Sequence, residues 1–206
     1  MAKLKLQAEV LNALEHNEML PFSDAQRKMV GFIKSGQNHW LIHENERELR
    51  IATVATIVHD LKQSFEDVAR ALILVPTSEI ADEYAELFEA LGKHTDLRVW
   101  TAYEGPKILQ QKEDIYFGAD VVIATPKRLN DLLNIEGFNS ASVQSLILDT
   151  TDQLLKVGNT AFTQRISDSI PPKQRIALSR DTERGIGNYM SVYCFPYEKT
   201  SLISPQ

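Results

Sequence analysis

Short runs of apolar residues constrain the fold of this chain more than any other feature. They read Ala71-Leu-Ile-Leu-Val75, Val121-Val-Ile-Ala124 and Leu146-Ile-Leu148. A strand with one wet face alternates apolar and polar residues, whereas a strand covered on both faces is apolar throughout. The runs therefore predict parallel strands that are buried beneath helices.

Amphipathic segments separate these runs. Apolar residues recur at helical spacing between Ile80 and Leu91, and Gly92 is placed to end that helix. This alternation predicts a three-layer α/β domain with a mainly parallel sheet and helices on both faces. The expected strands are 40–43, 71–75, 97–102, 121–124, 145–149 and 175–179, and the expected helical segments include 6–34, 128–133 and 160–170.

Composition narrows the class of protein. No apolar run approaches the roughly 20 residues that cross a membrane, and the N-terminus lacks the apolar segment of a signal peptide. The single cysteine, Cys194, has no partner for an internal disulfide, so we expect a buried thiol in a cytoplasmic protein. The net charge of −6 argues against a strong, general nucleic-acid binder, because affinity for phosphates grows with the number of Lys and Arg contacts.

Polar residues follow several of the predicted strands. Leu148 is followed by Asp149-Thr150-Thr151-Asp152, and Thr77 and Thr125 each adjoin a proline at a strand-to-helix junction. Ligands of parallel α/β sheets bind at the carboxyl ends of strands, and the free N–H groups of helix starts attract phosphate. Thr and Pro also begin helices for purely structural reasons, so this signal alone is weak.

Taken in order, these motifs resemble the first RecA-like domain of the DEAD-box RNA helicases. The matching segments are 22–26 (the Q motif), 76–81, 104–105, 125–128, 149–152 (the Asp-Glu-Ala-Asp box) and 178–181. The resemblance covers nearly the whole chain and implies a RecA-like, P-loop NTPase-type fold. It divides residues 1–206 into a helical Q-motif-like region, 1–36, and an α/β core, 37–206, with no second RecA domain expected.

The segment that would bind phosphate departs from the family pattern. The glycine-rich phosphate loop falls on residues 43–50, where Glu46 and Glu48 stand at two glycine positions. Leu49 replaces the lysine that pairs with phosphate oxygens, and Arg50 replaces the hydroxyl that holds the metal. Because each lost contact is worth about 1–3 kcal/mol, ATP binding is expected to be very weak.

The box that would carry out hydrolysis is changed as well. Asp149 is kept, but Thr150 stands where the family has the glutamate that activates water, and a threonine hydroxyl is no base near neutral pH. Thr151 and Asp152 complete this degenerate box. Ser179 is kept in the third motif, and no Ser-His-Asp pattern supports a role for it as a nucleophile. No catalytic residue is therefore expected.

Cofactor and metal binding are expected to be absent, with ATP and Mg²⁺ expected only if the nucleotide site works despite its changes. Gln26 matches the adenine-reading glutamine, but Glu9 stands where the family has a stacking aromatic residue, so Gln26 is interpreted as vestigial. His39, His43 and the adjacent Glu44 supply no complete set of ligands at zinc-like spacing. Ion pairs from Arg47 or Arg50 to Glu46, Glu48 or Asp149 are expected to fill the vacated site.

Residues on the RNA-contacting side are better kept. The resemblance assigns RNA contacts to Thr77, Gly105, Thr125 and Arg128, and Lys127 replaces a glycine there. With few basic groups in this set, the prediction is weak, salt-sensitive RNA binding.

These observations lead to a main hypothesis and two alternatives. The main one is a helicase-like domain without ATPase or unwinding activity that acts as a weak RNA-binding or regulatory module. One alternative is a protein-interaction module that pairs with an active helicase or a ribonucleoprotein. The other is an ATP-dependent RNA helicase half with an altered nucleotide site. No membrane partner is expected.

Overall fold

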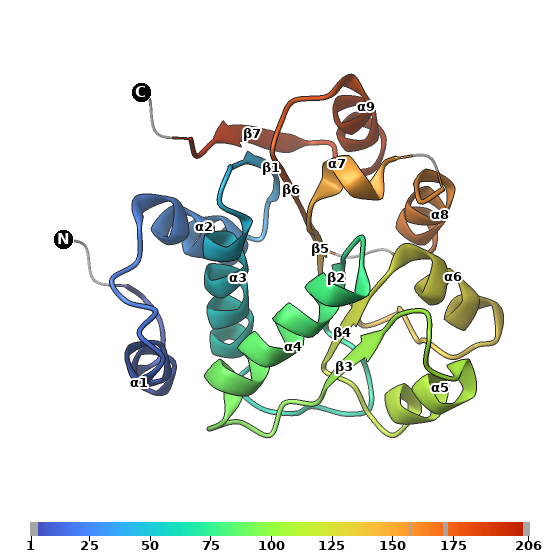
Figure 1. Ribbon diagram of the computed structural model, residues 1–206, viewed down its shortest axis with the longest axis horizontal. Helices are drawn as coiled ribbons and strands as arrows, with labels where there is room; N and C mark the ends of the chain where they lie inside the picture. The colour runs from blue at the N-terminus through green and yellow to red at the C-terminus, as the bar shows by residue number, and fades with distance from the viewer. Residues whose placement is uncertain (1–3, 157, 171–172, 204–206) are drawn as a thin grey trace.

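The computed structural model describes residues 4–156, 158–170 and 173–203, and in these residues one seven-stranded sheet has the order β3-β4-β2-β5-β6-β1-β7 (Figure 1). Every strand pairing is parallel, which confirms the predicted fold class. The strands are β1 (Asn38–Ile42), β2 (Ala71–Leu74), β3 (Val99–Ala102), β4 (Val121–Ala124), β5 (Ser145–Leu148), β6 (Gln174–Ser179) and β7 (Tyr197–Ser201).

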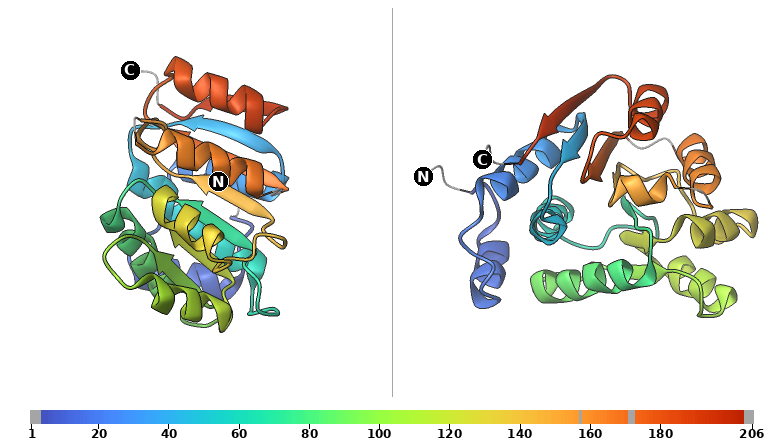
Figure 2. Two further views of the ribbon diagram at one scale, coloured as in Figure 1. Left: turned by 90° about the vertical axis from the view of Figure 1, so that its right-hand side faces the viewer. Right: turned by 45° about the horizontal axis from the view of Figure 1, so that its top comes forward.

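Helices cover both faces of the sheet. One face carries α1 (Ala8–His16), α2 (Asp24–Ser35), α3 (Glu46–Leu61) and α4 (Ser78–Gly92). The other carries α5 (Ile108–Tyr116), α6 (Pro126–Asn134), α8 (Thr160–Ser169) and α9 (Arg184–Tyr193), which face the viewer in the left panel of Figure 2, and the short α7 (Thr151–Leu154) follows β5.

The apolar runs supply both cores at once. Ala71 and Ile73 pack into the core beneath α1–α4, whereas Leu72 and Leu74 pack into the core beneath the other helices. Successive side chains of a strand point to opposite faces, so a strand buried on both sides needs an apolar residue at every position. This alternation explains why the runs predicted a parallel sheet.

The predicted helical region 6–34 consists of two helices, α1 and α2, and some other predicted boundaries were wrong. Helix α2 begins with a capping box in which Ser23 and Gln26 bond each other's backbone N–H. Strand β1 ends at Ile42, so His43 lies beyond the strand that holds His39. Strand β7 was not predicted, because Tyr-Glu-Lys-Thr-Ser has no apolar run and lies at an exposed edge of the sheet.

Candidate functional site

The candidate nucleotide site lies at the carboxyl edge of the sheet. Strands β2, β5, β6 and β1 are successive neighbours, so the segments that follow them lie close together. These segments carry Thr77, Asp149, Arg180 and the turn from β1 into α3. The sheet topology thus gathers the motifs that the sequence predicted to be one site.

The segment expected to be a degenerate phosphate loop is a short turn followed by a capped helix. Helix α3 begins at Glu46, directly after the N-cap Asn45, whose Oδ1 accepts a hydrogen bond from the Glu48 N–H at 3.4 Å. The amide of Asn45 also donates to Glu48 Oε1 at 2.9 Å. Glu46 and Glu48 therefore lie in the first helical turn, where carboxylates stabilise the helix dipole.

The residues at the lysine and hydroxyl positions both point into the protein. Leu49 is 1% exposed and belongs to the core between the sheet and α1–α4. The Arg50 side chain is 7% exposed, and its Nε lies 2.6 Å from Asp149 Oδ2. Its Nη1 lies 2.6 Å from Glu83 Oε2, and its Nη2 lies 3.4 Å from Glu46 Oε2. Arg50 is thus surrounded by carboxylates.

Burial and pairing act against each other in the contact between Arg50 and Asp149. Burial opposes the charge of Arg50, but its acidic neighbours, Asp149 first among them, together outweigh burial and raise the pKa of the guanidinium. Burial raises the pKa of Asp149 as well, although Arg50 opposes that rise. The raised pKa of Arg50 favours the ion pair, whereas the raised pKa of Asp149 favours a neutral carboxyl. The 2.6 Å contact and a hydrogen bond from Thr150 Oγ1 to Asp149 Oδ1 at 3.1 Å support an ionised pair near neutral pH.

A second arginine extends this arrangement to the surface. Arg180 Nε and Nη2 lie 2.8 and 3.0 Å from the two carboxylate oxygens of Glu46. We call Arg50, Asp149, Glu83, Glu46 and Arg180 the arginine–carboxylate network. The predicted ion pairs of Arg50 with Glu46 and Asp149 are confirmed.

The other predicted cation of this segment pairs differently. Arg47 lies 3.7 Å from Glu83 rather than at Glu46, Glu48 or Asp149, so that part of the prediction was wrong. Its side chain is 68% exposed, in contrast to the buried Arg50.

The remaining box residues make structural contacts. Thr150 has a left-handed backbone with φ 52°, and Thr151 Oγ1 donates to the Leu148 carbonyl at 2.9 Å. Asp152 is 8% exposed in the short helix α7. Ser179 Oγ accepts a hydrogen bond from Trp40 Nε1 and donates one to the Asp181 carbonyl, both at 2.8 Å.

Gln26, at the adenine-reading position, is also hydrogen-bonded within the domain. Gln26 is 5% exposed, its Oε1 accepts from the Ser23 N–H at 2.9 Å, and its Nε2 donates to the Glu48 carbonyl at 3.2 Å. Ser23 Oγ donates to Glu48 Oε2 at 2.9 Å. The sequence did not reveal that Glu48 ties the Q-motif-like region to α3. Both ends of the Gln26 amide have protein partners here.

The predicted RNA contacts separate into exposed and buried residues. Gly105 and Lys127 are exposed, and Thr77 is the N-cap of α4. Thr125 is buried, and its hydroxyl donates to Glu104 Oε2 at 2.6 Å. The structure therefore places a carboxylate beside one of the threonines that the resemblance assigns to phosphate binding.

Arg128, to which the resemblance assigns an RNA contact, is hydrogen-bonded within the domain. It is 8% exposed, and its Nη1 donates to the Pro106 carbonyl at 3.0 Å and to Gln111 Oε1 at 2.6 Å. The side chain links α6 to α5 and to the turn before it. Spacing alone could not reveal this, because both partners follow β3 whereas Arg128 follows β4.

The position of Arg50 decides whether the site fits ATP and Mg²⁺. The Arg50 guanidinium lies against the Asp149 carboxylate, which is the group that would hold a metal through water. Across the described ranges, no group of three or more His, Cys, Asp or Glu side chains is arranged to hold a metal. Because Arg50 pairs with both Asp149 and Glu83, the residues present do not fit this cofactor. No helix in the part of the chain that the structure describes is long and apolar enough to span a membrane.

Known proteins resemble this chain in both sequence and fold. A family model described as DEAD/DEAH box helicase matches residues 51–179, which begin just after the segment 43–50. DEAD-box ATP-dependent RNA helicase 9 of Oryza sativa subsp. japonica is 35% identical over 124 residues, covering 60% of this chain and 19% of that protein. Putative DEAD-box ATP-dependent RNA helicase 29 of Arabidopsis thaliana is 32% identical over 157 residues, covering 75% and 19%.

Solved structures share the fold. A DEAD box protein from the hyperthermophile Methanococcus jannaschii matches with a TM-score of 0.85 at 24% identity, covering 98% of this chain and 55% of that one. An ATP-dependent RNA helicase, described as hypothetical, from Sulfolobus tokodaii also matches with a TM-score of 0.85, at 21% identity. The chain spans about a fifth of the length of the two plant relatives.

Proposed function

Because the chain belongs to the DEAD/DEAH box helicase family and has the fold of its N-terminal RecA-like domain, we propose that it acts by binding rather than by turning over ATP. The observation that carries this proposal is the position of Arg50 between Asp149 and Glu83, at 2.6 Å from each. A nucleotide with its metal would have to displace this guanidinium and leave two buried carboxylates without it. Breaking one partner out of a buried pair costs about 3–5 kcal/mol, which ATP contacts would first have to offset.

Three further features support the loss of nucleotide chemistry. The turn 43–45 between β1 and α3 is too short for a glycine-rich loop, and the helix start is capped by Asn45. The amide of Gln26 is bonded to Ser23 and to Glu48. Thr150 offers a hydroxyl where a general base is needed, and this hydroxyl donates a hydrogen bond to Asp149. These features support separate losses of nucleotide binding and of hydrolysis.

We propose that RNA is a weak, salt-sensitive ligand of the RNA-contacting motifs, which follow β2, β3 and β4. Lys127 and Gly105 are exposed there, whereas Arg128 is bonded internally. The carboxylates of Glu104 and Glu79 lie at the two threonine-bearing junctions and oppose the approach of phosphate. This acidic character also supports the alternative, in which the domain recognises a protein.

An RNA-binding assay combined with an ATPase assay tests the proposal. We expect no ATP hydrolysis above background, with or without single-stranded RNA. In fluorescence anisotropy at low salt, Lys127→Ala should weaken RNA binding about twofold, because one phosphate contact is lost. Lys93→Ala is the matched control. Lys93 is exposed at the C-terminal end of α4, whereas Thr77 caps the N-terminal end of the same helix.

The possible outcomes separate the hypotheses. RNA-stimulated hydrolysis would refute the proposal that the domain acts without ATP turnover. RNA binding that is absent, or equally sensitive to Lys127→Ala and Lys93→Ala, would refute the RNA ligand and favour the protein-interaction alternative.

A further inference from the structure

A groove of about 420 Å³ lies between α2 and the segment 4–7, which precedes α1. None of its described lining residues belongs to the candidate nucleotide site or to the RNA-contacting motifs. We call it the basic groove. Its lining includes Leu4 and Lys5 from the N-terminal segment, and Arg27, Val30, Gly31 and Lys34 from one face of α2.

The basic groove concentrates positive charge in a chain whose net charge is −6. Lys5, Arg27 and Lys34 line it, and no Asp or Glu is among the described residues that do so. Lys34 also lines a neighbouring pocket together with Asp60, and that carboxylate partly opposes the charge of Lys34. Three cations around one groove attract an anionic group.

Hydrogen bonds position two of these cations. Lys34 Nζ donates to the Lys5 carbonyl at 2.9 Å and lies 2.7 Å from His59 Nε2. Arg27 Nε donates to the Phe22 carbonyl at 3.1 Å. Burial and the charge of Lys34 lower the pKa of His59, so its ring is neutral near pH 7. Both partners of Lys34 are therefore uncharged, and the ammonium keeps its attraction for an anion.

The floor of the groove is apolar and open. Val30 is 5% exposed and belongs to the core beneath α1–α4, and Leu4 packs against the same core. A Cβ at Gly31 would meet no atom within 4 Å. The part of the chain that the structure describes thus leaves room above this turn of α2 for a side chain from outside. A ligand that combines an apolar group with negative charge matches both the floor and the cations.

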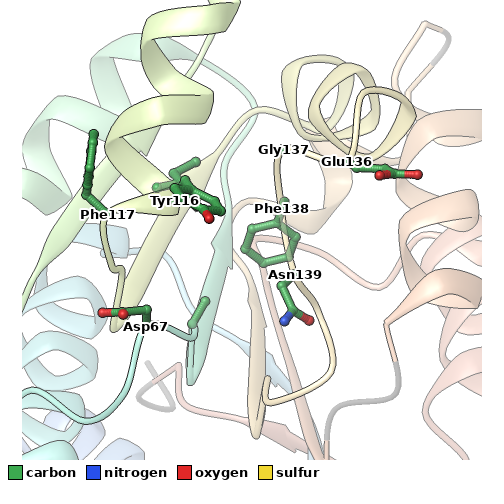
Figure 3. Close-up of a pocket in the computed structure, with 9 residues that line it drawn as sticks. Asp67, Tyr116, Phe117, Glu136, Gly137, Phe138 and Asn139 are labelled. Atoms are coloured by element: carbon green, nitrogen blue, oxygen red, sulfur yellow. The ribbon is translucent and has the colours of Figure 1, made fainter.

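A second pocket, of about 460 Å³, lacks this combination (Figure 3). It lies between the end of α5 and the turn after α6, at the amino edge of the sheet. Figure 3 shows its two carboxylates, Asp67 and Glu136, on opposite sides of the pocket and pointing outward, and Asp67 pairs with Arg98 at 2.7 Å. These carboxylates do not converge on one ligand, so this second pocket serves as a reference region in the experiment below.

We propose that the basic groove binds an acidic segment of a partner protein, in which two carboxylates flank an apolar side chain. The carboxylates pair with Lys5 and Lys34, and the apolar side chain covers Val30 in the space above Gly31. The groove favours a peptide over RNA, because no aromatic side chain lines its described part to stack on a base. The proposal goes beyond the proposed function and does not depend on the state of the nucleotide site.

Nuclear magnetic resonance of the isotope-labelled chain tests this with a defined probe. The probe is a blocked glycine–serine octapeptide with a central glutamate–leucine–glutamate, and its control has glutamine in place of both glutamates, which keeps the shape without the charge. At low salt we expect saturable shifts of the amide signals of residues 4–7 and 27–35 with the acidic peptide, and none at residues 115–118 or 136–139. A dissociation constant in the millimolar range is enough for so short a probe.

A carboxylate placed in the groove gives the sharpest variant. Gly31→Glu fills the open space with a negative charge, and Glu favours a helix more than Gly does, so the fold is kept. Gly31→Gln is the matched control, because it fills the same space without the charge. We expect Gly31→Glu to bind the acidic peptide about fivefold more weakly than Gly31→Gln does, as one repulsive charge predicts.

Loss of a cation gives a second variant. Lys5→Gln should weaken the acidic peptide about threefold, as expected for one exposed ion pair. Lys28→Gln is the matched control, because Lys28 is exposed on α2 but does not line the groove. Amide spectra of each variant show whether it is folded.

Several outcomes would overturn the proposal. These are equal binding of the glutamine peptide, equal binding to Gly31→Glu and Gly31→Gln, or no saturable shift in the millimolar range. Stronger shifts of the same amides by a short single-stranded RNA would assign the groove to nucleic acid instead. Shifts that grow with the concentration of the chain alone would assign it to a second copy of the chain.

Discussion

Two buried aspartates at opposite edges of the sheet show how differently the same side chain can be used. Asp120, at the amino end of β4, accepts hydrogen bonds from Arg70 Nη2 at 2.7 Å and Arg98 Nε at 3.0 Å. The backbone N–H groups of Arg98 and Phe65 also donate to it, both at 3.0 Å. Burial alone would raise the pKa of Asp120, but these hydrogen bonds lower it.

Asp149, at the carboxyl end of β5, has fewer partners. Its side-chain donors are Arg50 and Thr150, and burial raises its pKa above the usual value despite Arg50. Asp120 thus has the partners of a structural carboxylate, whereas Asp149, which the resemblance places in the Asp-Glu-Ala-Asp box, pairs with Arg50 from α3. This difference supports the proposal that the arginine–carboxylate network takes the place of a ligand, while the Asp120 cluster holds strand ends together.

The largest expected effect comes from removing the cation of the network. Arg50→Ala should lower the free energy of unfolding by about 3–5 kcal/mol, because it leaves Asp149 and Glu83 buried without their shared partner. Urea denaturation measures the loss. Arg47→Ala is the control, since its side chain is 68% exposed and 3.7 Å from Glu83.

A double variant sharpens this prediction. Arg50→Ala combined with Asp149→Ala should be less destabilised than the sum of the single variants, because the unpaired charge is gone. A loss under about 1 kcal/mol for Arg50→Ala alone would show that the network does not stabilise the fold.

The two aspartates should respond unequally to removal of their charge. Asp120→Asn should cost about 1–3 kcal/mol, because two arginines and two backbone amides lose an ionised acceptor. Asp149→Asn should cost less, since burial already disfavours the charged form of Asp149. Equal losses in urea denaturation would contradict the contrast between the two sites.

The destabilisation by Asp120→Asn and the destabilisation by Asp149→Asn should change in opposite directions as the pH changes. The lowered pKa of Asp120 gives stability that is present above the unfolded value of about 3.9 and is lost as the pH falls. The raised pKa of Asp149 gives stability that is present below that value and is lost as the pH rises through the folded value. Destabilisation by Asp120→Asn should therefore shrink on acidification, and that by Asp149→Asn should grow. Denaturation curves at several acidic pH values check the two slopes, and parallel slopes would refute the assignment.

The smallest effect is expected at the surface of the network. Arg180→Ala should change the free energy of unfolding by about 0–0.5 kcal/mol, because its side chain is 59% exposed and water screens its pair with Glu46. Thermal denaturation beside Arg50→Ala measures this difference. A loss as large as that of Arg50→Ala would mean that Arg180 helps to hold the buried part of the network.

The sequence predicted the parallel sheet because its buried strands are apolar at every position, and it predicted Arg50 pairing because the substitutions themselves were charged. It could not predict the inward turn of Arg128, which depends on partners from another strand-to-helix connection. The Asp120 cluster was missed for the same reason. Arg70 and Arg98 reach Asp120 from segments far away in sequence, which strand order alone brings together.

Calorimetric titration of the wild-type chain with ATP and Mg²⁺ tests the central claim most directly. We expect no saturable heat even at millimolar nucleotide, because Arg50 already pairs with Asp149 and Glu83. Micromolar, Mg²⁺-dependent binding would contradict this claim and would show that the domain binds ATP despite the Arg50 pairing.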